Sequence, residues 1–322
     1  MSATHPDDLA PEVRRVFVLV NNRRNDALDV AAKMCASLSG HGLVVRVLEE
    51  DAEALRMTAE DRCEVVPVGP EASADCELVV VLGGDGTILR AAELARESGT
   101  PLLGVNLGHV GFLAEAEPED TEATINAIVD RAYTAEERTT LDVEVYEGGR
   151  LVCTSWALNE ASVEKAARER MLEVVVEIDG RPLSRWGCDG VVCATPTGST
   201  AYNFSAGGPI VWPAVQALLI VPISAHALFA RPMVVAPTSR LAVEVIAGTN
   251  AAGVLWCDGR RTQSLPPGAR IEVTRGHMPV YLARLHDRPF TDRLVAKFDL
   301  PVEGWRGASE RRRKPGTDGG PA

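Results

Sequence analysis

The segment Leu78-Val79-Val80-Val81-Leu82-Gly83-Gly84-Asp85-Gly86-Thr87 indicates the architecture of the first part of the chain. Its first five residues are all apolar, which is typical of a strand buried on both faces of a parallel sheet. Three glycines follow within four positions, and a helical pattern then runs from Thr87 to Ser98 and ends at Gly99. A strand that passes through a glycine turn into a helix is a unit of an open α/β sheet.

The flanking sequence continues this alternation. We expect further strands at Val16–Val20, Leu43–Leu48 and Pro101–Val105, and further helices at Asp26–Leu38 and Glu119–Arg131. Strands that alternate with helices predict a parallel α/β sheet. The sequence therefore predicts an N-terminal α/β domain over residues 1–134.

The pattern changes near Arg138, after which short β-rich runs predominate. These runs are residues 141–146, 151–158, 172–178, 233–235, 241–246, 253–256 and 271–273. Asp179-Gly180 lies between two apolar runs, which is a hairpin signal. We therefore expect an all-β second domain over residues 135–287. The apolar spacing of Phe290–Phe298 predicts a helix that returns, within residues 288–306, to the first domain, and residues 307–322 have too little apolar content to pack.

Composition and charge exclude several classes of protein. The chain has 322 residues, of which 46% are hydrophobic, and a formal net charge of −12. A negative field disfavours binding to nucleic acid or to an anionic membrane surface. We find neither a secretory signal nor an apolar stretch long enough to span a membrane. The seven cysteines form no Cys-x-x-Cys pair, which disfavours a structural zinc site or a disulfide framework and suits a cytoplasmic protein with reduced thiols.

The glycine turn at residues 83–86 has the character of an anion site. Glycines leave backbone N–H groups uncovered, and a helix N-terminus adds partial positive charge, so the turn suits a di- or triphosphate. A carboxylate such as Asp85 repels phosphate, but it suits a general base or an anchor for a divalent metal. Arg90, one helical turn later, would balance charge. The alternative is a plain strand-to-helix turn with Asp85 as its cap. The turn matches neither the P-loop nor the dinucleotide-binding glycine pattern.

Three more segments carry candidate binding groups. Asn106 lies in a second glycine turn, Gly104–Gly111, which should open at the same sheet edge as the first. The pair Asn159-Glu160 offers an amide and a carboxylate suited to a ribose diol, although a turn explains the pair better when it is considered by itself. The uncharged segment Thr195–Tyr202 combines hydroxyls, a glycine and an aromatic ring, and it continues into Ser205-Ala206-Gly207-Gly208. Small residues with hydroxyls let a ligand approach the backbone closely, whereas such clusters also occur in ordinary loops.

Taken together, these motifs resemble those of the NAD kinase family, from about Arg15 to Arg306. The glycine turn alone is not specific, because lipid kinases and phosphofructokinases have similar turns. The discriminating segments are Gly104–Gly108, Leu158–Glu160, and Asp189-Gly190 leading into Thr195–Tyr202, in the family's order and approximate spacing.

This resemblance implies transfer of the terminal phosphate of ATP to the 2′-hydroxyl of the adenosine ribose of NAD, which gives NADP. It implies that Asp85 is the proton acceptor. Residues implied to bind the substrates are Gly83, Gly84, Asp85, Gly86, Thr87, Arg90, Asn106, Asn159, Glu160, Arg170, Asp189, Thr200, Ala201, Tyr202, Asn203, Phe204 and Ser205. The resemblance further implies a β-sandwich-like second domain, a divalent metal, usually Mg²⁺, with no ligands assigned, and a homodimer or homotetramer. Some bacterial members accept polyphosphate as the donor.

Two other functions stay open at this point. A lipid kinase would use the same glycine turn but needs a surface for acyl chains, and the sequence has no amphipathic membrane helix. A non-catalytic dinucleotide sensor would keep Asn159 and Glu160 but has no need of Asp85.

Overall fold

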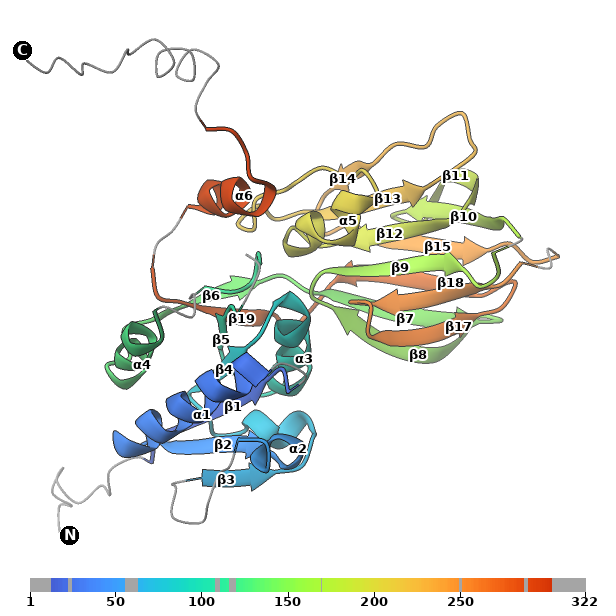
Figure 1. Cartoon of the computed structure of the whole chain (residues 1–322). Coiled ribbons are helices and arrows are strands. Elements are labelled where there is room, and N and C mark those ends of the chain that lie inside the picture. Colours follow the sequence, from blue (N-terminus) through green and yellow to red (C-terminus); the bar gives the residue numbers. More distant parts are fainter. Residues whose placement is uncertain are drawn as a thin grey trace, which may run out of the picture.

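Two domains of different architecture lie side by side in the computed structural model (Figure 1). The structure describes residues 13–22, 25–55, 63–107, 111–115, 120–168, 170–248, 251–286 and 289–302. Within these residues, no helix is long and apolar enough to cross a membrane. The predicted fold class, a parallel α/β domain followed by a β domain, is confirmed.

The first domain is built on a seven-stranded sheet in the order β3-β2-β1-β4-β5-β19-β6. Its elements are β1 (Arg15–Val20), α1 (Asn25–Gly40), β2 (Val44–Leu48), α2 (Glu49–Ala52), β3 (Cys63–Val66), the 3₁₀ helix η2 (Pro70–Ser73), β4 (Leu78–Leu82), α3 (Asp85–Ala95), β5 (Leu102–Val105), α4 (Thr121–Val129), β6 (Thr134–Arg138) and β19 (Val280–Arg284). All neighbouring pairs are parallel except β19 with β6.

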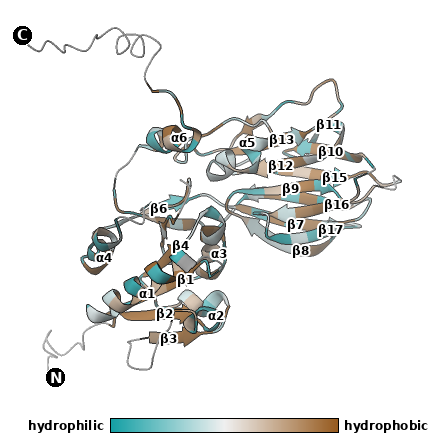
Figure 2. Cartoon of the chain, viewed as in Figure 1, coloured by the Kyte–Doolittle hydropathy of each residue, from teal (hydrophilic) through white to brown (hydrophobic). Residues whose placement is uncertain are grey.

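The sheet is covered on both faces because successive residues of a strand point to opposite sides. Val16 and Val18 of β1 pack with Ala31 of α1 and Ile125 of α4 in one apolar cluster. Phe17, the residue between those valines, packs in a second cluster with Val79 of β4 and Ile88 of α3. Figure 2 shows the apolar colour concentrated in these strands. The uniformly apolar sequences of β1 and β4 are thus explained by burial on both faces.

The second domain contains two six-stranded antiparallel sheets, in the orders β11-β10-β15-β18-β7-β8 and β14-β13-β12-β9-β16-β17. The strands of the first are β7 (Leu141–Glu147), β8 (Arg150–Ala157), β10 (Leu172–Ile178), β11 (Arg181–Cys188), β15 (Leu241–Val245) and β18 (Arg270–Arg275). Those of the second are β9 (Glu160–Lys165), β12 (Gly190–Ala194), β13 (Leu218–Ile223), β14 (Met233–Val235), β16 (Gly253–Cys257) and β17 (Arg261–Leu265). One apolar core, which includes the fully buried Trp186, joins the two sheets into a sandwich.

The structure corrects the expected end of the second domain. The chain returns to the first sheet at β19, which lies between β5 and β6, so Val280–Arg284 belongs to the first domain although we expected the second to continue to residue 287. The physical reason is that β19 supplies buried Val280, Leu282 and Ala283 to the covered faces of that sheet. Short apolar runs of this kind carry no signal for which sheet they join.

The predicted C-terminal helix is present as α6 (Phe290–Phe298), but it contacts both domains. Phe290 and Phe298 both lie against Phe112, which follows β5, at centroid distances of 6.0 and 5.8 Å. On the other side, Phe298 packs on Phe204 and Phe290 on Trp212, both of the β domain. The expected C-terminal tail, residues 307–322, lies outside the described residues.

Candidate active site

Asp85 is held in place by the segment that follows β5. Strand β4 ends at Leu82, Gly84 precedes α3 with an extended conformation, and Asp85 is the first residue of the helix. The two oxygens of its carboxylate accept hydrogen bonds from the N–H groups of Phe112 and Leu113, both at 3.1 Å. The N-cap position of the helix is Gly84 and not Asp85. Asp85 therefore does more than end a turn: it joins the two glycine turns that the sequence placed at one sheet edge.

Gly111 permits this arrangement. A Cβ atom added to Gly111 would lie 2.3 Å from Oδ1 of Asp85, a distance that real contacts do not reach. The sequence analysis did not single out Gly111, because a glycine's role in a close approach depends on its tertiary neighbour.

A cavity of about 560 Å³ opens at the carboxyl ends of β1 and β4, beside Gly84 and Gly86, the two chain neighbours of Asp85. It is lined by Val20, Asn21, Asn22, Glu50, Gly84, Gly86, Thr87, Arg90 and Arg260. Ligands of open α/β sheets bind at this edge, and the first turn of α3 adds backbone N–H donors and partial positive charge. We call this cavity the phosphate pocket.

Two arginines bring positive charge to the phosphate pocket. Arg90 of α3, which the sequence analysis expected near the bound phosphates, lines the pocket and forms an ion pair with Glu50. Arg260 comes from the turn between β16 and β17 of the second domain. Burial, and next the nearby Arg260 guanidinium, lower the pKa of Arg90. This repulsion between the two cations favours an anion between them. The sequence analysis missed Asn21, Asn22, Glu50 and Arg260; for the two asparagines, the available signal was their place directly after a buried strand.

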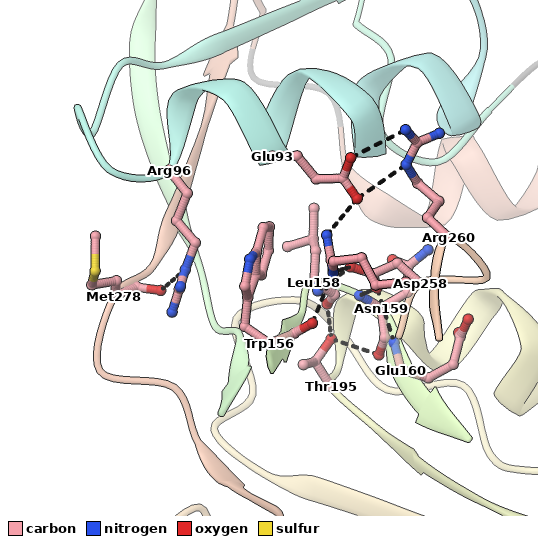
Figure 3. Close-up of polar contacts among 11 residues, drawn as sticks. Glu93, Arg96, Trp156, Leu158, Asn159, Glu160, Thr195, Asp258, Arg260 and Met278 are labelled. Carbon is pink, nitrogen blue, oxygen red and sulfur yellow. Dashed lines mark hydrogen bonds and ion pairs between the residues drawn. The ribbon is translucent and has the colours of Figure 1, made fainter. Parts of the chain in front are cut away.

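The two domains contact each other through polar side chains along α3 (Figure 3). Glu93 of α3 pairs with the guanidinium of Arg260 at 3.1 Å and also with Arg261. The Trp156 ring lies between the guanidiniums of Arg96 and Arg261, at 4.6 and 4.4 Å. Cations on aromatic faces are attracted by the ring quadrupole. Leu158 packs into the apolar cluster of Ile88 and Leu113, so the adjacent Asn159-Glu160 pair is brought to the helix that begins with Asp85.

A buried carboxylate, Asp258, fixes the backbone of that pair. Its oxygens accept hydrogen bonds from the N–H groups of Leu158 at 2.9 Å and Asn159 at 2.7 Å, and from the Arg261 guanidinium at 2.9 Å. Burial raises the pKa of Asp258, while these donors oppose the rise. Asp258 is separated from Leu158 and Asn159 by about 100 residues, so no local sequence pattern indicates its role in the site.

Glu160 is buried, and its carboxyl group accepts a hydrogen bond from the N–H of Tyr202 at 3.3 Å. Burial, reinforced by the neighbouring Asp258, raises the pKa of Glu160 to about 8. The side chain is therefore mostly protonated at neutral pH, so it both donates and accepts hydrogen bonds, as a ribose hydroxyl requires.

The hydroxyl-rich segment uses many of its polar groups internally. Strand β12 ends at Ala194, and the chain continues through η4 (Thr197–Thr200) and α5 (Tyr202–Ser205). Thr195 donates to the carbonyl of Leu158 at 2.6 Å, and Ser199 donates to that of Val211 at 3.0 Å. The fully buried Asn203 donates to the carbonyls of Ser199 and Pro209. These contacts give Thr195, Ser199 and Asn203 a role in holding the loop.

The other predicted residues of this segment remain at the surface of the loop. Thr200, Ala201 and Tyr202 are partly exposed, and Ser205 is exposed. Phe204 is also exposed but packs its ring against Phe298 of α6 at 4.8 Å. The loop thus presents its backbone and Tyr202 beside Glu160.

Asn106 lies at the sheet edge of the two glycine turns, whereas Asp189 lies apart from Glu160. Asn106 is buried directly after β5, and the residue before it, Val105, accepts a hydrogen bond at 3.0 Å from the N–H of Gly83, directly after β4. Asp189 precedes β12, whose first residue pairs with Glu164 of β9, while its last pairs with Glu160. Four residue steps along a strand separate these ends by roughly 13 Å. Asp189 forms an ion pair with Lys165 at 2.6 Å, which lowers the pKa of Asp189. Arg170 is exposed in the connection from β9 to β10.

The carboxylates of the site suit a metal ion that arrives with a nucleotide. Among the described residues, no group of three or more His, Cys, Asp or Glu side chains forms a ready-made metal site. Mg²⁺ is commonly held by one or two carboxylates together with substrate phosphates and water. Glu50 in the phosphate pocket and Asp85 beside it match that description.

Comparisons with known proteins agree with this geometry. Residues 16–133 match the family model of the ATP-NAD kinase N-terminal domain, and residues 158–285 match that of the C-terminal domain. The chain is 60% identical over 305 residues to an NAD kinase of Thermobifida fusca, with 93% of each chain covered. It is 61% identical to NAD kinase 2 of Streptomyces avermitilis, covering 92% of this chain and 97% of that protein.

Solved structures share the fold. A yeast NADH kinase in complex with NADH superposes with a TM-score of 0.81 at 23% identity, covering 91% of this chain and 89% of that one. An Archaeoglobus fulgidus NAD kinase in complex with ATP gives 0.63 at 24% identity, covering 90% and 100%. The matches favour the first of the three functions considered from the sequence and give no support to the lipid kinase. Two family models that together span most of the chain, and relatives at 60% identity, establish that the chain belongs to the NAD kinase family.

Proposed function

We propose that this protein transfers the terminal phosphate of ATP to the 2′-hydroxyl of the adenosine ribose of NAD and so produces NADP. The observation that carries the proposal is the position of Asp85, whose carboxylate is held by two backbone N–H groups at the edge of the phosphate pocket. Family membership supports the same reaction.

Binding of ATP follows from the lining of the phosphate pocket. The N–H groups at the start of α3 and the guanidiniums of Arg90 and Arg260 face the space where phosphates would lie. Phosphoryl transfer depends mainly on positioning and on neutralising charge. Arg260 belongs to the β domain, so the pocket is complete only when the two domains are joined.

Mg²⁺ in this site would neutralise charge on the phosphates of ATP, with Glu50 and Asp85 as the carboxylates available to hold it. Glu50 lines the pocket, and Asp85 lies between Gly84 and Gly86, which also line it.

Asp85 accepts the proton of the ribose hydroxyl. Its two hydrogen bonds to Phe112 and Leu113 fix the orientation of the carboxylate and leave further lone pairs for the hydroxyl. A positioned general base contributes roughly 10²- to 10⁴-fold to the rate.

Asn159 and Glu160 bind the ribose and base region of NAD, with Tyr202 beside them. The protonated carboxyl of Glu160 donates to a ribose oxygen and avoids placing a second negative charge near the phosphates. Asp258 keeps the backbone of this pair in position through the N–H groups of Leu158 and Asn159.

We further propose that the protein is cytoplasmic and forms a homodimer or homotetramer. Asp189 lies at the end of β12 that is roughly 13 Å from Glu160, and Arg170 is exposed beyond the end of β9, so in this proposal both reach NAD bound to a second copy of the chain. Polyphosphate remains a candidate donor, because the pocket recognises phosphate groups and is open to longer chains.

The test is NADP formation by the purified protein supplied with NAD, ATP and Mg²⁺, with Asp85→Asn in parallel. We expect turnover by the wild type and a loss of 10²- to 10⁴-fold in kcat for the variant, with the thermal midpoint retained. Unchanged kcat in a folded Asp85→Asn protein would refute Asp85 as the base. Absence of NADP with either ATP or polyphosphate, despite NAD binding measured by calorimetry, would instead favour the sensor.

A further inference from the structure

A second cavity, of about 720 Å³, lies away from the phosphate pocket. Its walls come from β6 and β19 at the edge of the first sheet, from residues 212–214 of the β domain, and from α6. Its volume falls in the range of small-molecule sites. We call it the arginine cavity, after Arg131, Arg138, Arg284 and Arg293, which line it.

Positive charge exceeds negative charge in the described part of this cavity. Glu136 pairs with Arg138 at 2.7 Å and with Arg284 at 2.8 Å. Glu115 pairs with Arg284 at 2.9 Å and with Arg293. Three guanidiniums thus share two carboxylates. Arg131, at the rim, shares Glu77 with Arg14 in the same way.

One hydrogen-bond donor of Arg138 has no partner among the described residues. The residue is 5% exposed, and its Nε atom is buried without a hydrogen-bond partner among the described residues. A buried donor without a partner costs about 1 to 3 kcal/mol, so such groups are rare unless a ligand or water satisfies them. Burial, and next the Arg284 cation, lower the pKa of Arg138 to about 10, which leaves the guanidinium charged at neutral pH.

Two aromatic side chains also line the cavity. Trp212 and Phe290 both line it, with ring centroids 5.3 Å apart and planes at 68°. Trp212 is half exposed even though its ring packs against Phe290, so part of this aromatic surface is open to solvent. Aromatic rings and guanidiniums in one cavity are complementary to a molecule with a flat ring at one end and an anion at the other.

We propose that the arginine cavity is a second ligand site, which binds a small compound carrying a phosphate group on an aromatic or heteroaromatic ring. The phosphate contacts Arg138, Arg284 and Arg293, where planar guanidiniums favour bidentate contacts with its oxygens. The ring lies against Trp212 and Phe290. This site shares no lining residue with the phosphate pocket.

The test uses phenyl phosphate as the probe and isothermal titration calorimetry of the full chain. To exclude the active site, the titration is made with NAD and a non-hydrolysable ATP analogue at saturating concentrations. We expect one equivalent of phenyl phosphate to bind, and inorganic phosphate to bind more weakly because it lacks the ring. Absence of saturable binding under these conditions would overturn the proposal.

Variants locate the binding. Arg138→Met and Trp212→Ala should each weaken phenyl phosphate binding about tenfold, because one removes a charge-assisted hydrogen bond and the other an aromatic wall. Trp212 is half exposed, so its replacement leaves the protein folded even if Arg138→Met does not, as a thermal melt will show. Arg260→Met, in the phosphate pocket, is the matched control and should bind the probe as the wild type does. Loss of binding in Arg260→Met, with binding retained in Trp212→Ala, would show that the probe occupies the phosphate pocket and would overturn the proposal.

Discussion

Replacing Gly111 with alanine tests whether the contact between the two glycine turns sets the activity. The added Cβ would lie 2.3 Å from Oδ1 of Asp85, whereas ordinary contacts begin near 3.4 Å, so the two atoms must separate by about 1 Å. Gly111 is not among the glycines with positive φ, so alanine fits its backbone. The carboxylate must therefore rotate, or the segment that donates to it must move.

The expected result is a fall of about 10²-fold in kcat, the usual consequence of a 1 Å displacement of a catalytic group. Stability should change little, because the loss of two hydrogen bonds is partly offset by the reduced freedom of alanine in the unfolded chain. Gly40→Ala, at the end of α1, is the matched control, since its added Cβ meets no atom within 4 Å.

A double-mutant cycle tests whether the effect of Gly111→Ala on kcat is transmitted through Asp85. If Gly111→Ala acts through Asp85, then adding it to Asp85→Asn should lower kcat no further. Steady-state NADP formation measures all four proteins, with urea unfolding to check that each is folded. A Gly111→Ala protein with kcat within threefold of the wild type would refute this reasoning, as would fully additive losses.

Two further predictions concern the buried carboxyl groups. Asp258→Asn keeps the shape of the side chain, and asparagine tolerates the positive φ of 54° at this position. The amide leaves at least one N–H of residues 158–159 without an acceptor, so we expect the free energy of unfolding in urea to fall by roughly 1 to 3 kcal/mol. Equal stability of the variant and the wild type would contradict the role given to this carboxylate. The pKa of Glu160, raised from 4.5 to about 8 on folding, makes its contribution to stability complete below about pH 4.5 and progressively lost as pH rises through about 8. Glu160→Gln cannot ionise, so its free energy of unfolding should fall less steeply between pH 5 and 8 than that of the wild type, and parallel profiles would count against the shift.

Much of the first domain follows from the sequence. Runs such as Leu78–Leu82 are apolar at every position, and burial on both faces of a parallel sheet is the arrangement that requires this. The glycine turn, Asp85 and Arg90 follow that strand directly, so their meeting at one sheet edge depends on local order along the chain. The motifs that resemble those of the NAD kinase family are likewise short contiguous segments, so they can be recognised in the sequence.

The rest required contacts between distant segments. Asp258 reaches Leu158 and Asn159 across about 100 residues, and Arg260 enters the phosphate pocket from the second domain. Strand β19 joins the first sheet because its apolar residues fit between β5 and β6. The amino-acid composition of the strand alone does not indicate which sheet it joins.

The sequence by itself thus determined the two-domain class, the family and the types of residue expected to carry out the reaction, because hydrophobic periodicity and contiguous motifs indicate these features. Only the tertiary structure decided that Gly111 must lack a side chain, that burial raises the pKa of Glu160, and that Arg138, which lines a second cavity, has a buried Nε without a partner. Each of these depends on the close approach and desolvation of groups far apart in the chain, which no local pattern encodes.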